Sequence, residues 1–217
     1  AYAYWNELAV KSDYVISIHG GGGIGCLMVP RVIIQEELGP KRLFIEKSLD
    51  MGKAIAMTDE WVISSRSEHT ARLEHTSIYD CAELGKPAIM IEIGGGMRDK
   101  KTLDHVVEIA VNGTMNVLKW AGMLKGRPVF PKSWRKIPEY SMIRPKNSGI
   151  VRYNWKYGLN SFVKKGTTLA TIDDLWGAKV EELKMPYDGI ILAHVCTISR
   201  RPSEPVAIVG KPPMILK

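Results

Sequence analysis

Cysteine is scarce in this sequence, which holds only Cys26, Cys81 and Cys196 among 217 residues. An odd number of widely separated cysteines is not a disulfide framework and fits a reducing compartment, so we expect a cytoplasmic protein. No uninterrupted apolar run approaches the roughly 20 residues that a membrane helix needs. The first residues lack the basic start and small-residue cleavage site of a secretory signal. These absences argue against disulfide-stapled, membrane-spanning and secreted proteins.

Motifs for nucleic-acid binding are also lacking, although the net charge is +7. Many of the basic residues fall between Arg98 and Lys146, and positive fields attract nucleic acid or anionic substrates. However, no RNA- or DNA-binding motif accompanies them, and Trp120 and Trp134 are not spaced as a stacking platform. We interpret this stretch as a solvated basic face and expect neither a nucleic-acid nor a membrane partner. The 45% of apolar residues is enough for a buried core.

Helix and strand signals alternate in the first part of the chain. Helical composition or spacing marks four segments: 1–12, 41–56, 69–84 and 101–120. Short apolar runs mark three strands: 13–18, 60–65 and 88–93. Alternation of this kind predicts an α/β fold, in which helices cover both faces of a parallel sheet.

A break in the pattern falls between residues 122 and 140, where three prolines and two glycines interrupt helix and sheet alike. Beyond the break, short alternating runs separated by glycine, proline or asparagine turns predict strands. We therefore expect two domains, an α/β domain over residues 1–135 and a small all-β domain over residues 141–217.

The β part repeats itself weakly. One unit runs from Gly149 to Ile172 and a second from Gly189 to Val209, which suggests a two-fold barrel or sandwich. The pattern resembles lipoyl- and biotinyl-carrier domains, which present a modified lysine on the turn between their halves. The corresponding turn here, residues 173–177, has no lysine at its tip. We therefore do not expect a swinging-arm function.

Two predicted strands each run into a glycine cluster and end on a residue suited to catalysis. The strand DYVISI is followed by His19 and four glycines, and PAIMI is followed by Glu92, Ile93 and three glycines. Glycine lets the backbone turn sharply and approach a ligand closely. If the strands are parallel neighbours, His19 and Glu92 emerge at the same edge, where α/β folds keep their sites. This pair indicates metal-assisted hydrolysis or acid/base chemistry.

Other motifs are weaker. Gly20, Gly22 and Gly25 satisfy G-x-G-x-x-G, but Pro30 and β-branched residues follow where a dinucleotide fold needs a helix. His19 and the next three glycines spell the HGGG motif of some esterases, but the chain has no G-x-S-x-G nucleophile elbow. Both interpretations are therefore disfavoured.

Three other histidines, His69, His75 and His105, have simple structural explanations. His105 and Glu108 form an H-x-x-E pair on one helix face and could hold a metal, but a solvated face is the favoured interpretation. His69 and His75 would point in different directions on a helix. Structural explanations also exist for the two main candidates, because a strand-end histidine can be a core residue and Glu92 could pair with Arg98.

Four segments carry a family resemblance in order and spacing: SDYVISIHGGGG, GKPAIMIEIGGG, VNGTMNVLKWAGMLKG and the tail from SGIVRYN to PVAIVG. Over most of the chain they resemble the succinylglutamate desuccinylase/aspartoacylase family of zinc carboxypeptidase-like amidohydrolases. The resemblance implies a mixed sheet flanked by helices, followed by a small barrel- or sandwich-hybrid-like β domain. It also implies hydrolysis of an amide or ester bond in an N-acylated amino acid or related small molecule, with one zinc ion.

The resemblance implies roles for two residues. His19 matches the histidine zinc ligand at a strand end. Glu92 matches the catalytic glutamate, which activates a water molecule and passes its proton to the leaving nitrogen. Zinc brings the pKa of a bound water to about 7, and a nearby carboxylate can then relay the proton.

The chain departs from the family pattern in three respects. Ser17 stands where the family has an aspartate. The family's other two zinc ligands, an H-x-x-E pair, belong upstream of the segment AYAYWNEL, and His105 and Glu108 come too late in the chain to replace them. The arginines that bind substrate are also mostly upstream, and Arg72 and Arg98 are the nearest local candidates. We therefore expect the C-terminal part of a longer enzyme.

Two functions follow as hypotheses. The first is a zinc-dependent amidohydrolase that acts on a small N-acyl substrate, which His19 and Glu92 favour. The alternative is a non-catalytic or regulatory relative that binds a small ligand without turnover, which Ser17 and the missing ligands favour. Assembly as a homo-oligomer is left open by the sequence.

Overall fold

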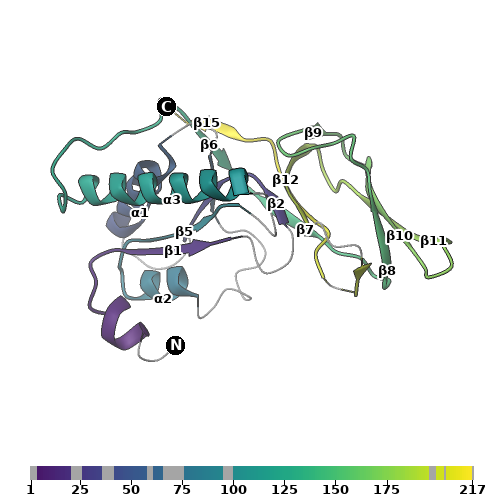
Figure 1. Cartoon of the computed structure of the whole chain (residues 1–217), viewed down its shortest axis with the longest axis horizontal. Helices are drawn as coiled ribbons and strands as arrows, with labels where there is room; N and C mark the ends of the chain where they lie inside the picture. The colour runs from purple at the N-terminus through teal and green to yellow at the C-terminus, as the bar shows by residue number, and fades with distance from the viewer. Residues whose placement is uncertain are drawn as a thin grey trace.

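The computed structural model describes residues 4–20, 26–35, 42–57, 61–65, 76–94, 100–195, 199–202 and 204–216. An α/β part and a β part lie side by side, with helices confined to the first of them (Figure 1). Within the described residues, no helix combines the length and the apolar character that crossing a bilayer requires.

A six-stranded sheet forms the centre of the α/β part, in the order β1-β5-β3-β4-β6-β15. Its strands are β1 (Val15–His19), β3 (Arg31–Ile34), β4 (Val62–Ser65), β5 (Ala88–Glu92), β6 (Trp134–Ile137) and β15 (Met214–Leu216). The pairs β1–β5, β3–β4 and β4–β6 are parallel, but β3 is antiparallel to β5 and β15 to β6. The mixed sheet implied by the family resemblance is confirmed. The wholly parallel sheet expected from the alternation of helix and strand is wrong, because β3 reverses direction.

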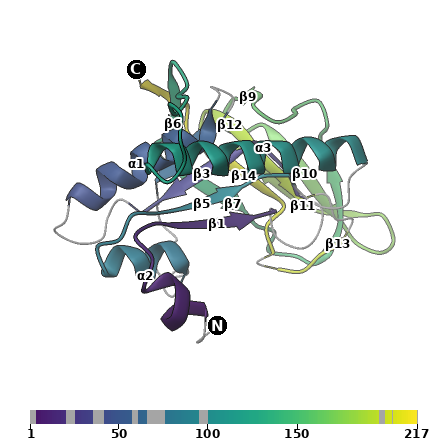
Figure 2. The ribbon, with the colours of Figure 1, turned by 60° about the vertical axis from the view of Figure 1, so that its left-hand side comes forward.

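Helices cover both faces of this sheet (Figure 2). The helices α1 (Arg42–Ala56) and α3 (Lys100–Trp120) pack on one face, in a core that includes Ile34, Ile55 and Ile91. The short helix α2 (Ser77–Glu83) packs on the other face, and the core there includes Ala9 from a π-helical turn, η1 (Tyr4–Ala9). Apolar residues at helical spacing explain these elements, because each helix buries one stripe against the sheet.

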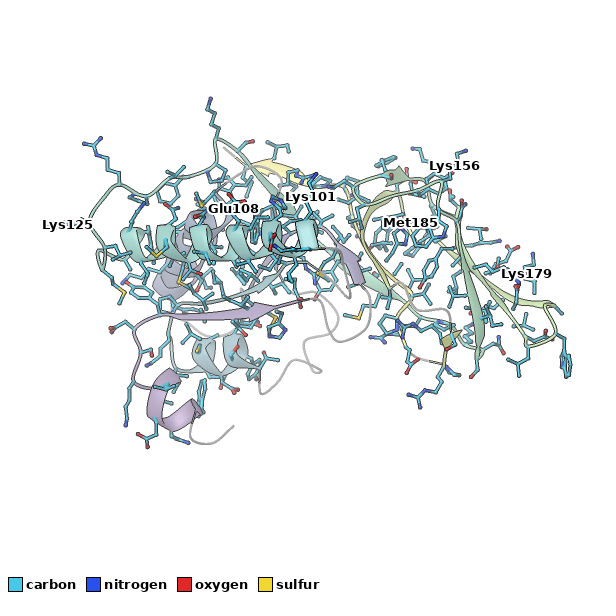
Figure 3. All side chains as sticks on the ribbon, in the orientation of Figure 1. Lys101, Glu108, Lys125, Lys156, Lys179 and Met185 are labelled. Carbon is cyan, nitrogen blue, oxygen red and sulfur yellow. The ribbon has the colours of Figure 1, made fainter. Side chains whose placement is uncertain are left out.

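The β part consists of two antiparallel sheets. One has the order β2-β12-β14-β7 with β9 added to β12, and the other has the order β11-β10-β8-β13. Their strands are β2 (Cys26–Met28), β7 (Tyr140–Ile143), β8 (Gly149–Tyr153), β9 (Phe162–Val163), β10 (Thr168–Asp173), β11 (Lys179–Lys184), β12 (Gly189–Val195), β13 (Ser199–Arg200) and β14 (Ala207–Gly210). Figure 3 shows Met185, which is 1% exposed, inside this part, with Lys156 and Lys179 on its outside.

Two glycines reveal the internal repeat. A Cβ on Gly149 would lie 2.2 Å from the carbonyl oxygen of Asp173, and a Cβ on Gly189 would lie 2.1 Å from that of Gly210. Each glycine is the first residue of its repeat unit, and the last strand of that unit passes so close to it that no side chain fits. The equivalent positions support the two-fold pattern expected from the sequence.

The two parts exchange strands. β2, from the first part of the chain, pairs with β12, and β15 at the other end returns to pair with β6 in the α/β sheet. One apolar cluster draws on both parts, including Met28 and Val62 on one side and Leu192 and Ile208 on the other. The division at residues 135 and 141 stays a prediction about independent domains.

Candidate active site

Parallel pairing brings His19 and Glu92 together at one edge of the sheet. β1 and β5 pair without a register shift, and His19 is the partner of Glu92 at the last paired position. Ile16, Ile89 and Ile91 pack toward α1 and α3, so alternation along the strands puts His19 and Glu92 on the α2 face. The expectation that both residues reach the same edge is therefore confirmed, while their chemical roles stay predictions.

The imidazole and the carboxylate face each other across a short gap. His19 Nδ1 lies 3.8 Å from Glu92 Oε1, which is longer than a hydrogen bond. The His19 side chain is 45% exposed and that of Glu92 is 14% exposed. The imidazole is thus open to a ligand arriving from solvent, while the carboxylate is largely shielded from water, where charge interactions are stronger.

Ser17 contacts the other ring nitrogen of His19. Its Oγ lies 3.1 Å from His19 Nε2, because residues two apart on a strand project from the same face. A metal-binding histidine normally has its second nitrogen held by a hydrogen bond, which fixes the tautomer and the ring orientation. Ser17 therefore makes the orienting contact at the position where the family resemblance implies aspartate, but without the negative charge.

Arg31 is a residue of this site that the sequence analysis missed. It opens β3, and because β3 is antiparallel to β5, Arg31 is the register partner of Glu92. Its side chain is 5% exposed, and its guanidinium lies 5.1 Å from the centre of the Tyr140 ring. Paired residues share a face of the sheet, so a buried positive charge accompanies Glu92. The sequence feature that could have pointed to this residue is an arginine directly before the apolar residues 32–34.

The backbone turns away directly after the two candidate residues. The amide of Ile93 donates a hydrogen bond to the carbonyl oxygen of His19 at 3.0 Å. Gly94 then adopts a φ of +85°, a conformation that other residues rarely take. A Cβ there would also lie 3.3 Å from Val106 of α3. Gly94 thus allows the chain to leave β5 close beneath the helix. The other glycines of the two clusters, apart from Gly20, lie outside the described residues.

His19 fits a zinc site as one ligand. Its Nε2 is engaged by Ser17, and its Nδ1 lies 3.8 Å from Glu92 Oε1. A catalytic zinc normally has three protein ligands, and within the described part of the chain no group of three or more histidine, cysteine, aspartate or glutamate residues could hold a metal. The described residues therefore supply one corner of such a site.

The other sequence candidates do not join this site. His105 and Glu108 are both exposed on α3, which covers the opposite face of the sheet from the His19 side chain. His69, His75, Arg72 and Arg98 lie outside the described residues.

Cys81 is a buried free cysteine and is excluded as a nucleophile or ligand. Burial raises the pKa of its thiol to about 11, although the charge of Lys86 opposes the shift. The thiolate is the reactive and metal-binding form, so this thiol stays protonated and inert at neutral pH.

Comparison with solved structures identifies the class of fold. The chain is similar to the product-bound ectoine utilization protein EutE (DoeB) from Ruegeria pomeroyi, with a TM-score of 0.75 and 21% identity over 97% of this chain. It is also similar to a succinylglutamate desuccinylase/aspartoacylase from Rhodobacter sphaeroides (TM-score 0.73, 18% identity, 97% of this chain). An aspartoacylase family protein from Mesorhizobium loti gives a TM-score of 0.70 and 19% identity over 98% of this chain.

The chain therefore has the fold of the succinylglutamate desuccinylase/aspartoacylase family. It spans 62% of the first two of these structures and 61% of the third. No family model and no curated protein matches the sequence.

Proposed function

We propose that this chain belongs to a zinc-dependent hydrolase that cleaves the amide or ester bond of an N-acylated amino acid or a related small molecule. The observation that carries the proposal is the pairing of His19 with Glu92 at one edge of the sheet, 3.8 Å apart. The shared fold is consistent with it, since one similar structure is that of a desuccinylase/aspartoacylase. A cytoplasmic location belongs to the same proposal.

In this proposal His19 is one of the zinc ligands, held in orientation by Ser17. When bound, zinc would polarise the substrate carbonyl and make water a better nucleophile at neutral pH. Glu92 lies within reach of the same space and takes up a proton from the attacking water. It then gives that proton to the leaving nitrogen, which would otherwise depart as an unstable anion.

Arg31 would assist by electrostatics. As the register partner of Glu92, and nearly buried, it places a permanent positive charge on the same face of the sheet. A charge at this place favours negatively charged groups that approach the same face of the sheet.

The alternative function is ligand binding without turnover. It is favoured by the missing carboxylate at Ser17 and by the lack of a three-ligand cluster within the described residues. The two functions differ in one property. A hydrolase requires further zinc ligands beside His19, whereas a binding protein does not.

The proposal is tested by substituting His19 or Glu92 and measuring the zinc content and the rate of hydrolysis. In a zinc-loaded preparation, Glu92→Gln keeps the shape of the side chain but cannot accept a proton. We expect normal zinc content and a kcat lowered by roughly 100-fold or more, the usual scale for acid/base catalysis. His19→Ala should instead lower the zinc content sharply. Glu83→Gln on α2 is the matched control, and it should change neither property.

Two outcomes would oppose this assignment. Hydrolysis of N-acyl amino acids by Glu92→Gln near the wild-type rate would make Glu92 structural. Zinc content unchanged by His19→Ala would remove His19 from the ligand set. If the 217-residue chain neither holds zinc nor turns over substrate, reading the coding sequence upstream for an H-x-x-E motif decides between the hydrolase and the binding protein.

A further inference from the structure

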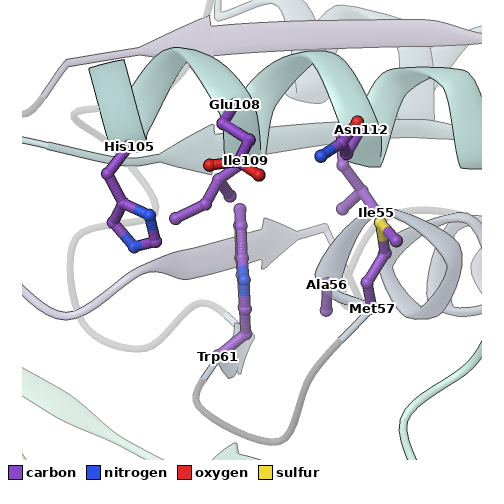
Figure 4. Close-up of a pocket in the computed structure, with 8 residues that line it drawn as sticks. All are labelled: Ile55, Ala56, Met57, Trp61, His105, Glu108, Ile109 and Asn112. Atoms are coloured by element: carbon purple, nitrogen blue, oxygen red, sulfur yellow. The ribbon is translucent and has the colours of Figure 1, made fainter. Parts of the chain in front are cut away.

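A cavity of about 180 Å³ lies on the face of the sheet opposite to His19 and Glu92. It is formed by residues 55–57 at and just after the end of α1, by Trp61 directly before β4, and by four residues of α3 between His105 and Asn112. Figure 4 shows the side chains of His105 and Glu108 extending from α3 toward the space beside Trp61, with Asn112 on the same helix near Ile55. The proposed hydrolysis makes no use of these residues.

α1 and α3 pack closely against each other beside the cavity. At Gly113 the helices are in close contact, since a Cβ there would lie 2.7 Å from the carbonyl oxygen of Ile55. Asn116 adds a polar link, because its Nδ2 donates to the carbonyl oxygen of Ala54 at 2.6 Å. Earlier on α3, His105, Glu108 and Ile109 line the cavity.

The walls of the cavity are already ordered. Ile55 and Ala56 are each 1% exposed and Trp61 is 4% exposed, as parts of the core between the helices and the sheet. Asn116 also accepts a hydrogen bond from the amide of Val129 at 2.8 Å, which ties α3 to the connection that follows it. A ligand would therefore meet a formed pocket and would not have to order its walls, which favours binding.

The residues that line the cavity determine which charge and shape of ligand it favours. The floor is apolar, and the rim carries the carboxylate of Glu108 with the imidazole of His105 and the amide of Asn112. Among the described residues, the lining includes no lysine or arginine. A neighbouring hollow shares His105 and Glu108 and adds Lys101 and Lys100, of which Lys100 is paired with Asp104 at 2.5 Å. A carboxylate over an apolar floor favours a cation with an apolar body and disfavours an anion.

The volume of the cavity limits the size of the ligand that it can bind. A cavity of about 150 Å³ accommodates a benzene molecule, so this one has room for a single ring with a short substituent. A tryptophan in the wall suits such a ligand, because aromatic rings attract both other rings and ammonium groups. We propose that the cavity binds a small organic ammonium ion, with its ring against Trp61 and its charged nitrogen beside Glu108.

Benzylammonium, benzyl alcohol and benzoate are the probes that test this proposal, since they share a ring and differ in charge. Methyl NMR spectra of isoleucine-labelled protein report the site through Ile55 and Ile109. Benzylammonium should shift these two signals in a saturable manner, benzyl alcohol should bind more weakly, and benzoate should not bind. Added salt should weaken the binding of benzylammonium, because its ion pair lies at an exposed rim.

Substitutions then locate the charge and the entrance. Glu108→Gln should weaken benzylammonium at least about 5-fold, whereas Glu83→Gln, the same change on α2, should leave it unchanged. Asn112→Trp adds bulk at the exposed mouth and should abolish binding. Val111→Trp, at a neighbouring position that is 54% exposed and does not line the cavity, should not. Unshifted Ile55 and Ile109 signals, equal affinity after Glu108→Gln, or preferred binding of benzoate would each overturn the proposal.

Discussion

A histidine that binds a metal through one ring nitrogen must present that nitrogen in a single direction. In this protein Ser17 contacts Nε2 of His19 at 3.1 Å and leaves Nδ1 facing Glu92. A carboxylate in place of Ser17 would orient the ring and also raise its basicity as a ligand. The hydroxyl keeps the first effect and loses the second, so Ser17 should preserve geometry at some cost in metal affinity.

The Ser17 contact makes a prediction that needs no catalytic assay. With zinc bound through Nδ1, the proton of His19 would lie on Nε2, where the Ser17 hydroxyl can accept it. Ser17→Ala removes this acceptor, so it should lower the zinc affinity by about 10-fold or more. Ser17→Asp should bind zinc more tightly than the wild type. Equal zinc affinity in the wild type and Ser17→Ala would contradict this orienting function.

The buried His194 should make the stability of the β part depend on pH. It is 2% exposed, and its Nε2 donates to the carbonyl oxygen of Tyr157 at 3.0 Å, since a carbonyl can only accept. Burial lowers the pKa of His194 below its usual value, although the hydrogen bond to Tyr157 opposes the shift. Because the unfolded chain then takes up a proton more readily than the folded one, stability should fall as the pH drops below about 6.5.

Urea unfolding of the wild type and His194→Gln at pH 7.5 and pH 5.5 measures this effect. The variant should be less stable at pH 7.5, because its packing against the Tyr153 and Trp155 rings is lost. The gap should narrow at pH 5.5, by at most about 1.4 kcal/mol for each pH unit below 6.5, since the wild type alone carries the cost of protonation. A gap that widens on acidification would show that the pKa of His194 is not depressed.

The pairing of His19 with Glu92 could be read from sequence, whereas that of Arg31 with Glu92 could not. Each catalytic candidate ends an apolar run and precedes glycines, and both features are local. The position of Arg31 depends on β3 running antiparallel to β5, and strand direction within a sheet is set by the path of the whole chain. Ser17 was noted only as a departure, because a strand pattern places it beside His19 without showing that its hydroxyl reaches the ring.

At the scale of the elements, the segments with strong periodicity were predicted well. The helix expected at 41–56 is α1 (Arg42–Ala56), and that expected at 101–120 is α3 (Lys100–Trp120). β6 was missed, because Trp134–Ile137 lies within a glycine- and proline-rich stretch and owes its strand form to its neighbours β4 and β15. Such a strand depends on partners remote in sequence and has little local signal.

The connection between α3 and β6 should be the first site of proteolysis. Residues 121–133 contain no regular element and are largely exposed, and Figure 3 shows Lys125 on this connection beyond the end of α3. Exposed segments without regular structure are the usual sites of nicking. Brief trypsin treatment should therefore cut after Lys125 and Lys132, while Arg127 is protected by Pro128.

A double variant, Lys125→Gln with Lys132→Gln, is the control for this cleavage. It should delay the appearance of the two large fragments, which peptide mass measurement identifies. Early cuts concentrated between residues 150 and 209, with this connection left intact, would contradict the prediction and the domain boundary that it supports.

At the scale of the whole molecule, the exchange of strands should join the two parts into one unfolding unit. β2 lies in a sheet of the β part, β15 lies in the α/β sheet, and Leu192 packs in a cluster that also holds Val62 and Met28. The boundary predicted after residue 135 marks a change in the sequence pattern, from alternating helix and strand signals to strand signals alone. The shared cluster makes separate unfolding costly, because either part alone would expose apolar residues that the other covers.

Hydrogen exchange in increasing urea, followed by mass spectrometry, tests this coupling. Peptides from α1 and β5 should lose protection at the same urea concentration as peptides from β10 and β12. Leu192→Ala, in the shared cluster, should lower this common midpoint by the equivalent of about 2–5 kcal/mol, the usual cost of such a deletion in a core. Leu183→Ala, whose cluster lies within the β part, should also lower the midpoint for both sets of peptides if the molecule unfolds as one unit. Loss of protection confined to β10 and β12 in Leu183→Ala, with α1 and β5 unchanged, would mean that the two parts unfold separately and that strand exchange joins them only weakly.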